Sequence, residues 1–252
     1  MTALAAPKSD LPVRTVSALV MVALAGTALF LGGGVWALFV GLVAAGVLLE
    51  WSRLALALTP HLSARLVWHL GGLFYVGIAC ATLIILRGNG GSFPAVALIV
   101  STVIGIDVGA YFTGRTLGGP KIAPAISPSK TWAGLLGGAL GAALVLFAFR
   151  QWFACTFPFE DGCSVPAALH LAVWSLSFGT LAAVIAQTGD FFESWMKRRA
   201  GVKDSSNLIP GHGGLFDRVD GLLALTFVLG LIMFGMAGLA LAHGESLLPS
   251  PA

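Results

Sequence analysis

Residues 222–242 read LLALTFVLGLIMFGMAGLALA, and this stretch contains no charged side chain. The hydrocarbon core of a bilayer is about 30 Å thick and a helix rises about 1.5 Å per residue, so roughly 20 apolar residues span it. The stretch therefore has the length and composition of a membrane-spanning helix. Six further apolar runs precede it, at residues 16–31, 35–49, 67–86, 93–114, 132–150 and 169–188.

The whole chain has the composition of a membrane protein. Of its 252 residues, 57% are hydrophobic and 10% are charged, whereas about 25% are charged in soluble domains. We predict an all-α fold, a polytopic transmembrane helical bundle of about seven spans, with a range of roughly six to nine. The range arises at Gly32, Gly33 and Gly34, where the first two runs form two helices, one long helix or a re-entrant pair. We assign residues 1–92 to N-terminal transmembrane helices and 93–252 to a catalytic transmembrane region with polar loops.

The first run has a second interpretation, which is a cleaved signal peptide. Lys8 and Arg14 precede it, as basic residues precede the apolar core of such a peptide. No convincing small-x-small cleavage site follows it, so we predict an uncleaved first span.

Lysine and arginine divide unequally between alternating loops. Twelve fall on the side of the N-terminus and two, Arg87 and Arg150, on the other, which accounts for all fourteen. Because cytoplasmic loops carry the excess of positive charge, we predict a cytoplasmic N-terminus. This topology places Cys155 and Cys163 in one external loop, either as a disulfide in an oxidising compartment or as two free thiols.

A polar, charged segment directly precedes the last span: SWMKRRAGVKDSSNLIPGHGGLFDRVDG, residues 194–221. If the helix of the sixth run continues past residue 188, Asp190, Ser194 and Lys197 share one of its faces. In the alternative interpretation, Lys197 forms an ordinary surface ion pair with Glu193. Further along, Asp217 and Asp220 are three residues apart and share a face at the start of the last span.

An upstream polar cluster lies within the fourth run. Asp107 is followed at helical spacing by Tyr111 and Gly114. An ionisable residue inside a span is energetically costly, so a functional role is the default hypothesis. The alternative is an interfacial Asp that pairs with Arg115 or a neighbouring helix.

Another polar cluster occupies the loop at residues 118–131. Its three prolines and two glycines prevent a regular helix, so backbone amides and the side chains of Lys121, Ser127 and Lys130 are free to face an anion. The alternative is a basic loop that only fixes topology and touches lipid headgroups.

Together the three clusters combine carboxylates with basic side chains. Carboxylates with few histidines and no clustered cysteines suit Mg²⁺, which binds one or two carboxylates plus substrate phosphates. Lysine and arginine suit phosphate oxygens. The combination indicates phosphoryl or nucleotidyl transfer.

The spacing in the 194–221 segment, S-x-x-K-R-x4-K-D followed by P-x-H-G-G-x-x-D-R-x-D, resembles the signature of the phosphatidate cytidylyltransferase (CDP-diacylglycerol synthase) family. Asp107…Tyr111…Gly114 and Ser127-Pro128-x-Lys130-Thr131 are similar to the flanking elements of that family. The resemblance covers about residues 107–221.

The resemblance implies a reaction of CTP with phosphatidate that yields CDP-diacylglycerol and pyrophosphate. It implies dependence on Mg²⁺, with a second cation as an option, and a homodimer. We expect the protein in the bacterial cell inner membrane, and the count of basic residues places its active site on the cytoplasmic side. The expected partners are CTP, phosphatidate and the lipid bilayer, and no nucleic acid.

We assign Asp190 and Asp217 as the leading metal ligands, with Asp220 as a ligand or a neighbour of one, and add Lys197 as a catalytic residue. His212 contacts a ligand or orders its loop and is no acid or base, because a phosphate monoester is already largely dianionic at neutral pH. Arg218, between two acids, is the basic residue best placed to pair with them. The expected substrate-binding residues are Asp107, Tyr111, Lys121, Ser127, Lys130, Ser194, Arg198, Lys203, His212, Gly213, Gly214 and Arg218.

Two other functions compete with this one. A CTP-dependent polyprenol or phytol kinase would use the same nucleotide, but it must deprotonate an alcohol and so needs a better-defined base. A transporter or channel would use Asp107 and Asp190 as ion-pathway residues. Transport predicts polar residues through the bilayer depth, whereas here they gather at one interface.

Overall fold

The computed structural model describes residues 11–88, 93–156 and 165–243. Within these residues the chain forms seven helices, all long and apolar enough to cross a membrane, which confirms the predicted all-α bundle and makes the chain a multi-pass membrane protein. Cys163 and the side chain of Cys155 lie outside the described residues, so their disulfide stays a prediction. The elements are α1 (Leu11–Leu31), α2 (Gly33–Leu58), α3 (Leu62–Arg87), α4 (Phe93–Thr116), β1 (Lys121–Ala123), β2 (Ser127–Thr131), α5 (Trp132–Thr156), α6 (Val165–Arg199) and α7 (Phe216–Ala242).

The first two spans are separate helices. Gly32 has a φ of +65°, a left-handed conformation that favours glycine, and it divides α1 from α2. Arg87, at the end of α3, donates from Nε to the carbonyl of Leu29 at 2.9 Å and from Nη2 to that of Phe30 at 3.0 Å. The end of α1 is therefore held by a cation on α3.

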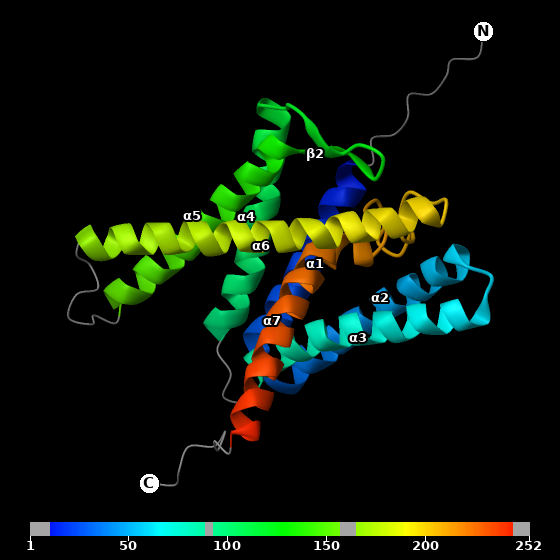
Figure 1. Ribbon diagram of the computed structural model, residues 1–252, viewed down its shortest axis with the longest axis horizontal. Coiled ribbons are helices and arrows are strands. Elements are labelled where there is room, and N and C mark those ends of the chain that lie inside the picture. The colour runs from blue at the N-terminus through cyan, green and yellow to red at the C-terminus, as the bar shows by residue number, and fades with distance from the viewer. Residues whose placement is uncertain (1–10, 89–92, 157–164, 244–252) are drawn as a thin grey trace.

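Helix α6 is the longest element, with 35 residues, and it crosses α7 in Figure 1. It packs against both α5 and α7, while α3 packs against both α2 and α7. The antiparallel hairpin of β1 and β2 joins α4 to α5, in the loop where no regular helix was expected. Strand β2 of the hairpin contacts both α5 and α6.

Helices α4 and α5 approach each other through glycine. A Cβ atom at Gly105 would lie 2.9 Å from the carbonyl oxygen of Gly141, and one at Gly109 would collide with the carbonyl of Gly137. Small residues allow such close backbone contact between membrane helices, where lipid supplies no hydrophobic drive for association. This contact fixes the helix that carries Asp107.

Two apolar cores meet at α6 and α7. One joins these helices to α2 and α3 through residues such as Trp51, Met196 and Phe216, and the other joins them to α4 and α5 through Ile106 and Ala183. Because α6 and α7 belong to both cores, the polar residues at their ends are held from two sides.

Candidate active site

Lys130 of β2 and Asp190 of α6 form an ion pair, which joins two of the three polar clusters of the sequence. Asp220 and Asp107 lie within electrostatic range of both. Burial by itself would lower the pKa of the Lys130 ammonium, but Asp190, Asp220 and Asp107 hold this pKa above its ordinary value. Lys130 therefore lies among three acidic side chains that favour its charged form.

A polar cavity of about 560 Å³ opens beside this pair. Four of the expected substrate-binding residues line it: Asp107, Tyr111, Lys130 and Arg218. Arg115 also lines the cavity and donates a hydrogen bond to the Tyr111 hydroxyl at 3.0 Å. This hydroxyl is its partner in the structure, whereas the alternative interpretation of the sequence paired Arg115 with Asp107. Residues from α4, β2, α6 and α7 thus enclose one space, although up to 111 positions separate them in sequence (107 to 218).

A further cluster lies along the contact between α6 and α7. Lys197 pairs with Glu193, with 2.8 Å between Nζ and Oε2, and with Asp217. The interpretation of Glu193 and Lys197 as an ordinary surface pair is wrong, because Glu193 is only 1% exposed. Among the described residues its Oε1 has no hydrogen-bond partner.

Asp217 uses both of its carboxylate oxygens. Oδ1 pairs with Lys197, and Oδ2 accepts from the backbone N–H of Ser205 and of Gly214, each at 3.0 Å. The Ser205 hydroxyl lies 2.8 Å from the same Oδ2. A Cβ atom at Gly214 would collide with Ser205 Oγ, so only glycine fits this turn. Asp217 thus organises the loop that leads into α7.

The sequence analysis missed Glu50 and the two serines that bind it. Glu50 is 2% exposed, lies in α2, and accepts hydrogen bonds from the hydroxyls of Ser205 and Ser206. The second apolar run ends at residue 49, yet α2 continues through Glu50 to Leu58. The sequence signal that could have identified Glu50 is an acidic residue directly after an apolar run.

Other predicted residues take varied positions. The ring Nδ1 of His212 lies 2.8 Å from Ser17 Oγ on α1, and the His212 carbonyl accepts from Arg218 at 2.6 Å from Nη2. Arg218 therefore bonds to a carbonyl, where we had expected an acid. Arg198 Nε lies 3.4 Å from the carbonyl of Ile126. Six other predicted residues do not line the cavity. Of these, Ser127 is buried, Ser194, Gly213 and Asp220 are half-buried, and Lys121 and Lys203 are exposed.

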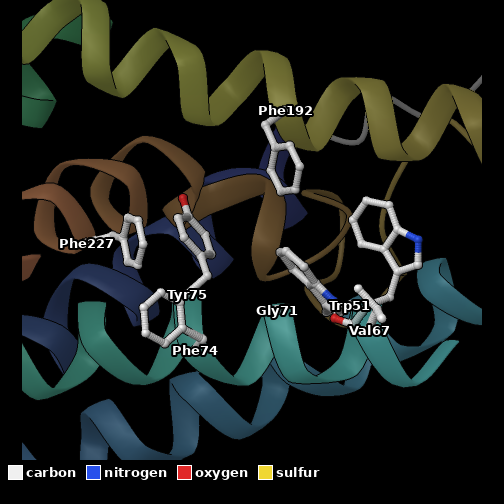
Figure 2. Close-up of a pocket in the computed structure, with 8 residues that line it drawn as sticks. Trp51, Val67, Gly71, Phe74, Tyr75, Phe192 and Phe227 are labelled. Atoms are coloured by element: carbon white, nitrogen blue, oxygen red, sulfur yellow. Dashed lines mark hydrogen bonds between the residues drawn. The ribbon is translucent and has the colours of Figure 1, made fainter. Parts of the chain in front are cut away.

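An apolar groove of about 450 Å³ lies on another side of α6 and α7, lined by aromatic residues of α2, α3, α6 and α7. Figure 2 shows Phe192 of α6 facing the rings of Trp51 and Tyr75 across it. Tyr75 lies within electrostatic range of Asp220, and Phe192 lies between Asp190 and Glu193 in α6. The groove thus adjoins the acidic residues.

Mg²⁺ was expected, and the donor set near Lys130 fits it. Among residues 11–88, 93–156 and 165–243, no three His, Cys, Asp or Glu side chains are arranged as a metal site. Mg²⁺ needs no such cage, because it retains waters and binds one or two carboxylates plus substrate phosphates. Asp190, with Asp220 in electrostatic range, offers hard oxygen donors where an ammonium already binds. Asp217, which we had assigned to the same ion as Asp190, lies in the cluster around Lys197.

These features define a polytopic membrane protein with a polar, cation-lined cavity beside an apolar groove. Residues 63–235 match the family model described as the cytidylyltransferase family, and the chain belongs to that family. This confirms the resemblance seen in residues 107–221.

Several relatives carry the name phosphatidate cytidylyltransferase. The chain is 41% identical to the protein of Brucella suis over 169 residues, which are 67% of this chain and 57% of that relative. It is 34% identical to the protein of Rickettsia bellii over 232 residues, 90% of this chain and 94% of the relative. The chain thus spans little more than half of the Brucella relative and nearly all of the Rickettsia one.

Proposed function

We propose that this protein is a phosphatidate cytidylyltransferase, which converts CTP and phosphatidate into CDP-diacylglycerol and pyrophosphate. Family membership and the names of the relatives support the nucleotide and the lipid. The observation that carries the proposal is the position of the Lys130–Asp190 pair, at a polar cavity and close to an apolar groove. Such a pair of spaces suits a reaction between a water-soluble polyanion and a lipid polyanion.

The chemistry needs charge neutralisation more than proton transfer. An oxygen of the lipid phosphate attacks the α-phosphorus of CTP, and the bond from this phosphorus to the bridging oxygen of pyrophosphate breaks. The phosphate monoester is already mostly dianionic at neutral pH, so no strong general base is required. Lys130 and Arg218, which line the cavity, hold phosphate oxygens and stabilise the charge that develops on the leaving group.

We propose that Asp190 and Asp220 hold Mg²⁺. The ion, when bound, neutralises phosphate oxygens and orients the nucleotide. Lys130, which pairs with Asp190 and lines the cavity, would bind the substrate phosphates. Asp217 would join the same ion only by releasing Lys197, so it acts through the loop that it organises.

The proposed setting is the bacterial inner membrane, with the N-terminus and the site on the cytoplasmic side. The count of twelve basic residues against two supports this orientation. CTP is a cytosolic nucleotide, which fits a site on that side. A homodimer is part of the proposal on the family resemblance alone.

The reaction is tested with purified protein, phosphatidate, Mg²⁺ and CTP labelled in the α-phosphate. We expect the label to enter the lipid phase as pyrophosphate is released. Label that reaches lipid only from the γ-position would identify a kinase and contradict the proposal.

The aromatic groove is proposed to hold an acyl chain of the lipid. Gly71 of α3 lines the groove, and a Cβ atom there would meet no heavy atom within 4 Å, so a larger side chain fits and fills the space. Gly71→Leu should lower kcat/KM for a long-chain phosphatidate by about tenfold, because a hydrophobic pocket discriminates by size on that scale. A short-chain phosphatidate should be affected much less.

The matched control is Gly77→Leu, since Gly77 lies on the same helix, has equally open space and does not line the groove. An equal loss with both chain lengths, or the same loss in Gly77→Leu, would contradict an acyl chain in this groove.

A further inference from the structure

Glu50 is a buried acid that the reaction does not use directly, and its carboxylate faces four hydrogen-bond donors. Its Oε1 accepts from the Ser206 hydroxyl and from the backbone N–H of Leu215 at 2.9 Å. Its Oε2 accepts from the backbone N–H of Phe216 at 2.7 Å and lies 2.9 Å from Ser205 Oγ. Each carboxylate oxygen thus serves one hydroxyl and one backbone amide.

The four donors lie at the two ends of a single loop. Ser205 and Ser206 precede it, Leu215 and Phe216 close it, and the segment between them, residues 207–214, contains His212, Gly213 and Gly214. Glu50 therefore ties together both ends of the segment that carries these expected substrate contacts.

The same contacts cap α7. The first amides of a helix have no partner within it, and the N-cap residue Leu215 provides no side-chain cap. Glu50 supplies both a partner and a negative charge at this positive helix end. The second residue of that helix is Asp217, which also binds Ser205.

The Ser205 hydroxyl links the two acids. It lies between Glu50 Oε2 and Asp217 Oδ2 and has only one hydrogen, so it can donate to one of them at a time. Ser205 thus connects Glu50 to Asp217, and Asp217 in turn pairs with Lys197.

We propose that Glu50 is a positioning residue, which through Ser205, Ser206 and the start of α7 holds the 207–214 segment in the geometry that binds CTP. The inference rests on the proposed function. It also assigns a role in the site to α2, which lies outside residues 63–235 of the family match.

The test compares Glu50→Gln, Glu50→Asp and a control in full-length protein. Glutamine has nearly the same shape as glutamate, but its NH₂ group replaces one of the two acceptor oxygens. Each of these oxygens accepts from a backbone N–H, so Glu50→Gln breaks at least one backbone hydrogen bond. We expect kcat/KM for CTP to fall by about tenfold or more, as when a residue that orients a ligand-binding group is lost, with KM for phosphatidate unchanged. Glu50→Asp keeps the carboxylate and should recover part of the loss.

Hydrogen exchange gives a readout that does not depend on activity. The amides of Leu215 and Phe216 should exchange faster in Glu50→Gln, while amides in the middle of α2 and α3 stay protected. The control is Trp36→Phe, which removes the 2.9 Å bond from Trp36 Nε1 to the carbonyl of Leu83 and so loosens α2 from α3 far from the loop. It should change neither the CTP dependence nor the loop amides.

The proposal is overturned if Glu50→Gln keeps the CTP dependence of the wild type, or if Trp36→Phe reproduces its effect. It is also overturned if Glu50→Gln loses activity while Leu215 and Phe216 remain protected. If Glu50→Gln cannot be purified, Ser206→Ala removes one of the four contacts and should give a smaller change in the same direction. Wild-type protein that fails the α-label test would refute the proposed function, whereas the exchange result still decides whether Glu50 anchors the loop.

Discussion

Asp190→Asn is expected to lower turnover by at least about 100-fold, the scale on which enzymes lose rate when a preorganised electrostatic group is removed. Asparagine keeps the shape of the side chain but loses the charge that pairs with Lys130. It also loses the proposed Mg²⁺ ligand beside Asp220. The measurement is the initial rate of lipid labelling from α-labelled CTP at several Mg²⁺ concentrations, with yield in the membrane fraction unchanged.

Thr188→Val is the matched control for this variant. Thr188 is exposed on the same stretch of α6, and its hydroxyl bonds to the carbonyl of Ile185 in its own helix. It should retain wild-type turnover. Near-wild-type activity of Asp190→Asn would remove the proposed metal assignment.

A double variant separates two roles of Asp190. If this residue serves only to neutralise Lys130, then Lys130→Gln combined with Asp190→Asn should recover the lost activity, since neither charge is then left alone. We expect no recovery, because in the proposed reaction Lys130 also binds the substrate phosphates and Asp190 also holds Mg²⁺.

Asp217→Asn is expected to lower turnover to a similar degree, by at least about 100-fold, through the loop geometry on which substrate alignment depends. Asparagine has one acceptor oxygen where Asp217 has two, so either Lys197 or the loop amides of Ser205 and Gly214 lose their acceptor. The lost negative charge also weakens the contact that remains, because a charged acceptor forms the stronger hydrogen bond. Hydrogen exchange at the amides of Ser205 and Gly214 should rise together with the loss of activity.

Asp204→Asn provides the comparison, because Asp204 is an exposed acid of the same loop. It should show neither the loss of turnover nor the faster exchange. Loss of turnover in Asp217→Asn without any change at Ser205 and Gly214 would mean that Asp217 contacts the reacting groups directly.

The bundle could be predicted from the sequence, because lipid imposes a simple length rule on spanning helices. All seven expected runs lie within helices of the structure. Their ends could not be predicted, since helices continue where apolar composition stops: α2 passes Glu50 to reach Leu58, and α6 passes Thr188 to reach Arg199. The short hairpin around residues 121–131 gave no periodic signal.

The site was predictable only as a set of residues. Spacing within one segment identified Asp190, Lys197 and Asp217, but it did not tell which acid lies beside which base. The division into one cluster around Lys130 and another around Lys197 depends on how α6 crosses α7 and where the hairpin returns. Glu50 was missed because its four partners lie 155 to 166 positions away in sequence.

The length of α6 has a consequence for how a lipid meets a nucleotide. With 35 residues it measures about 52 Å along its axis, far more than the roughly 30 Å of hydrocarbon in a bilayer. Such a rod must lean strongly or project several turns beyond the acyl tails. Its charged terminus can then lie among the headgroups, at the depth of the lipid phosphate in the proposed reaction.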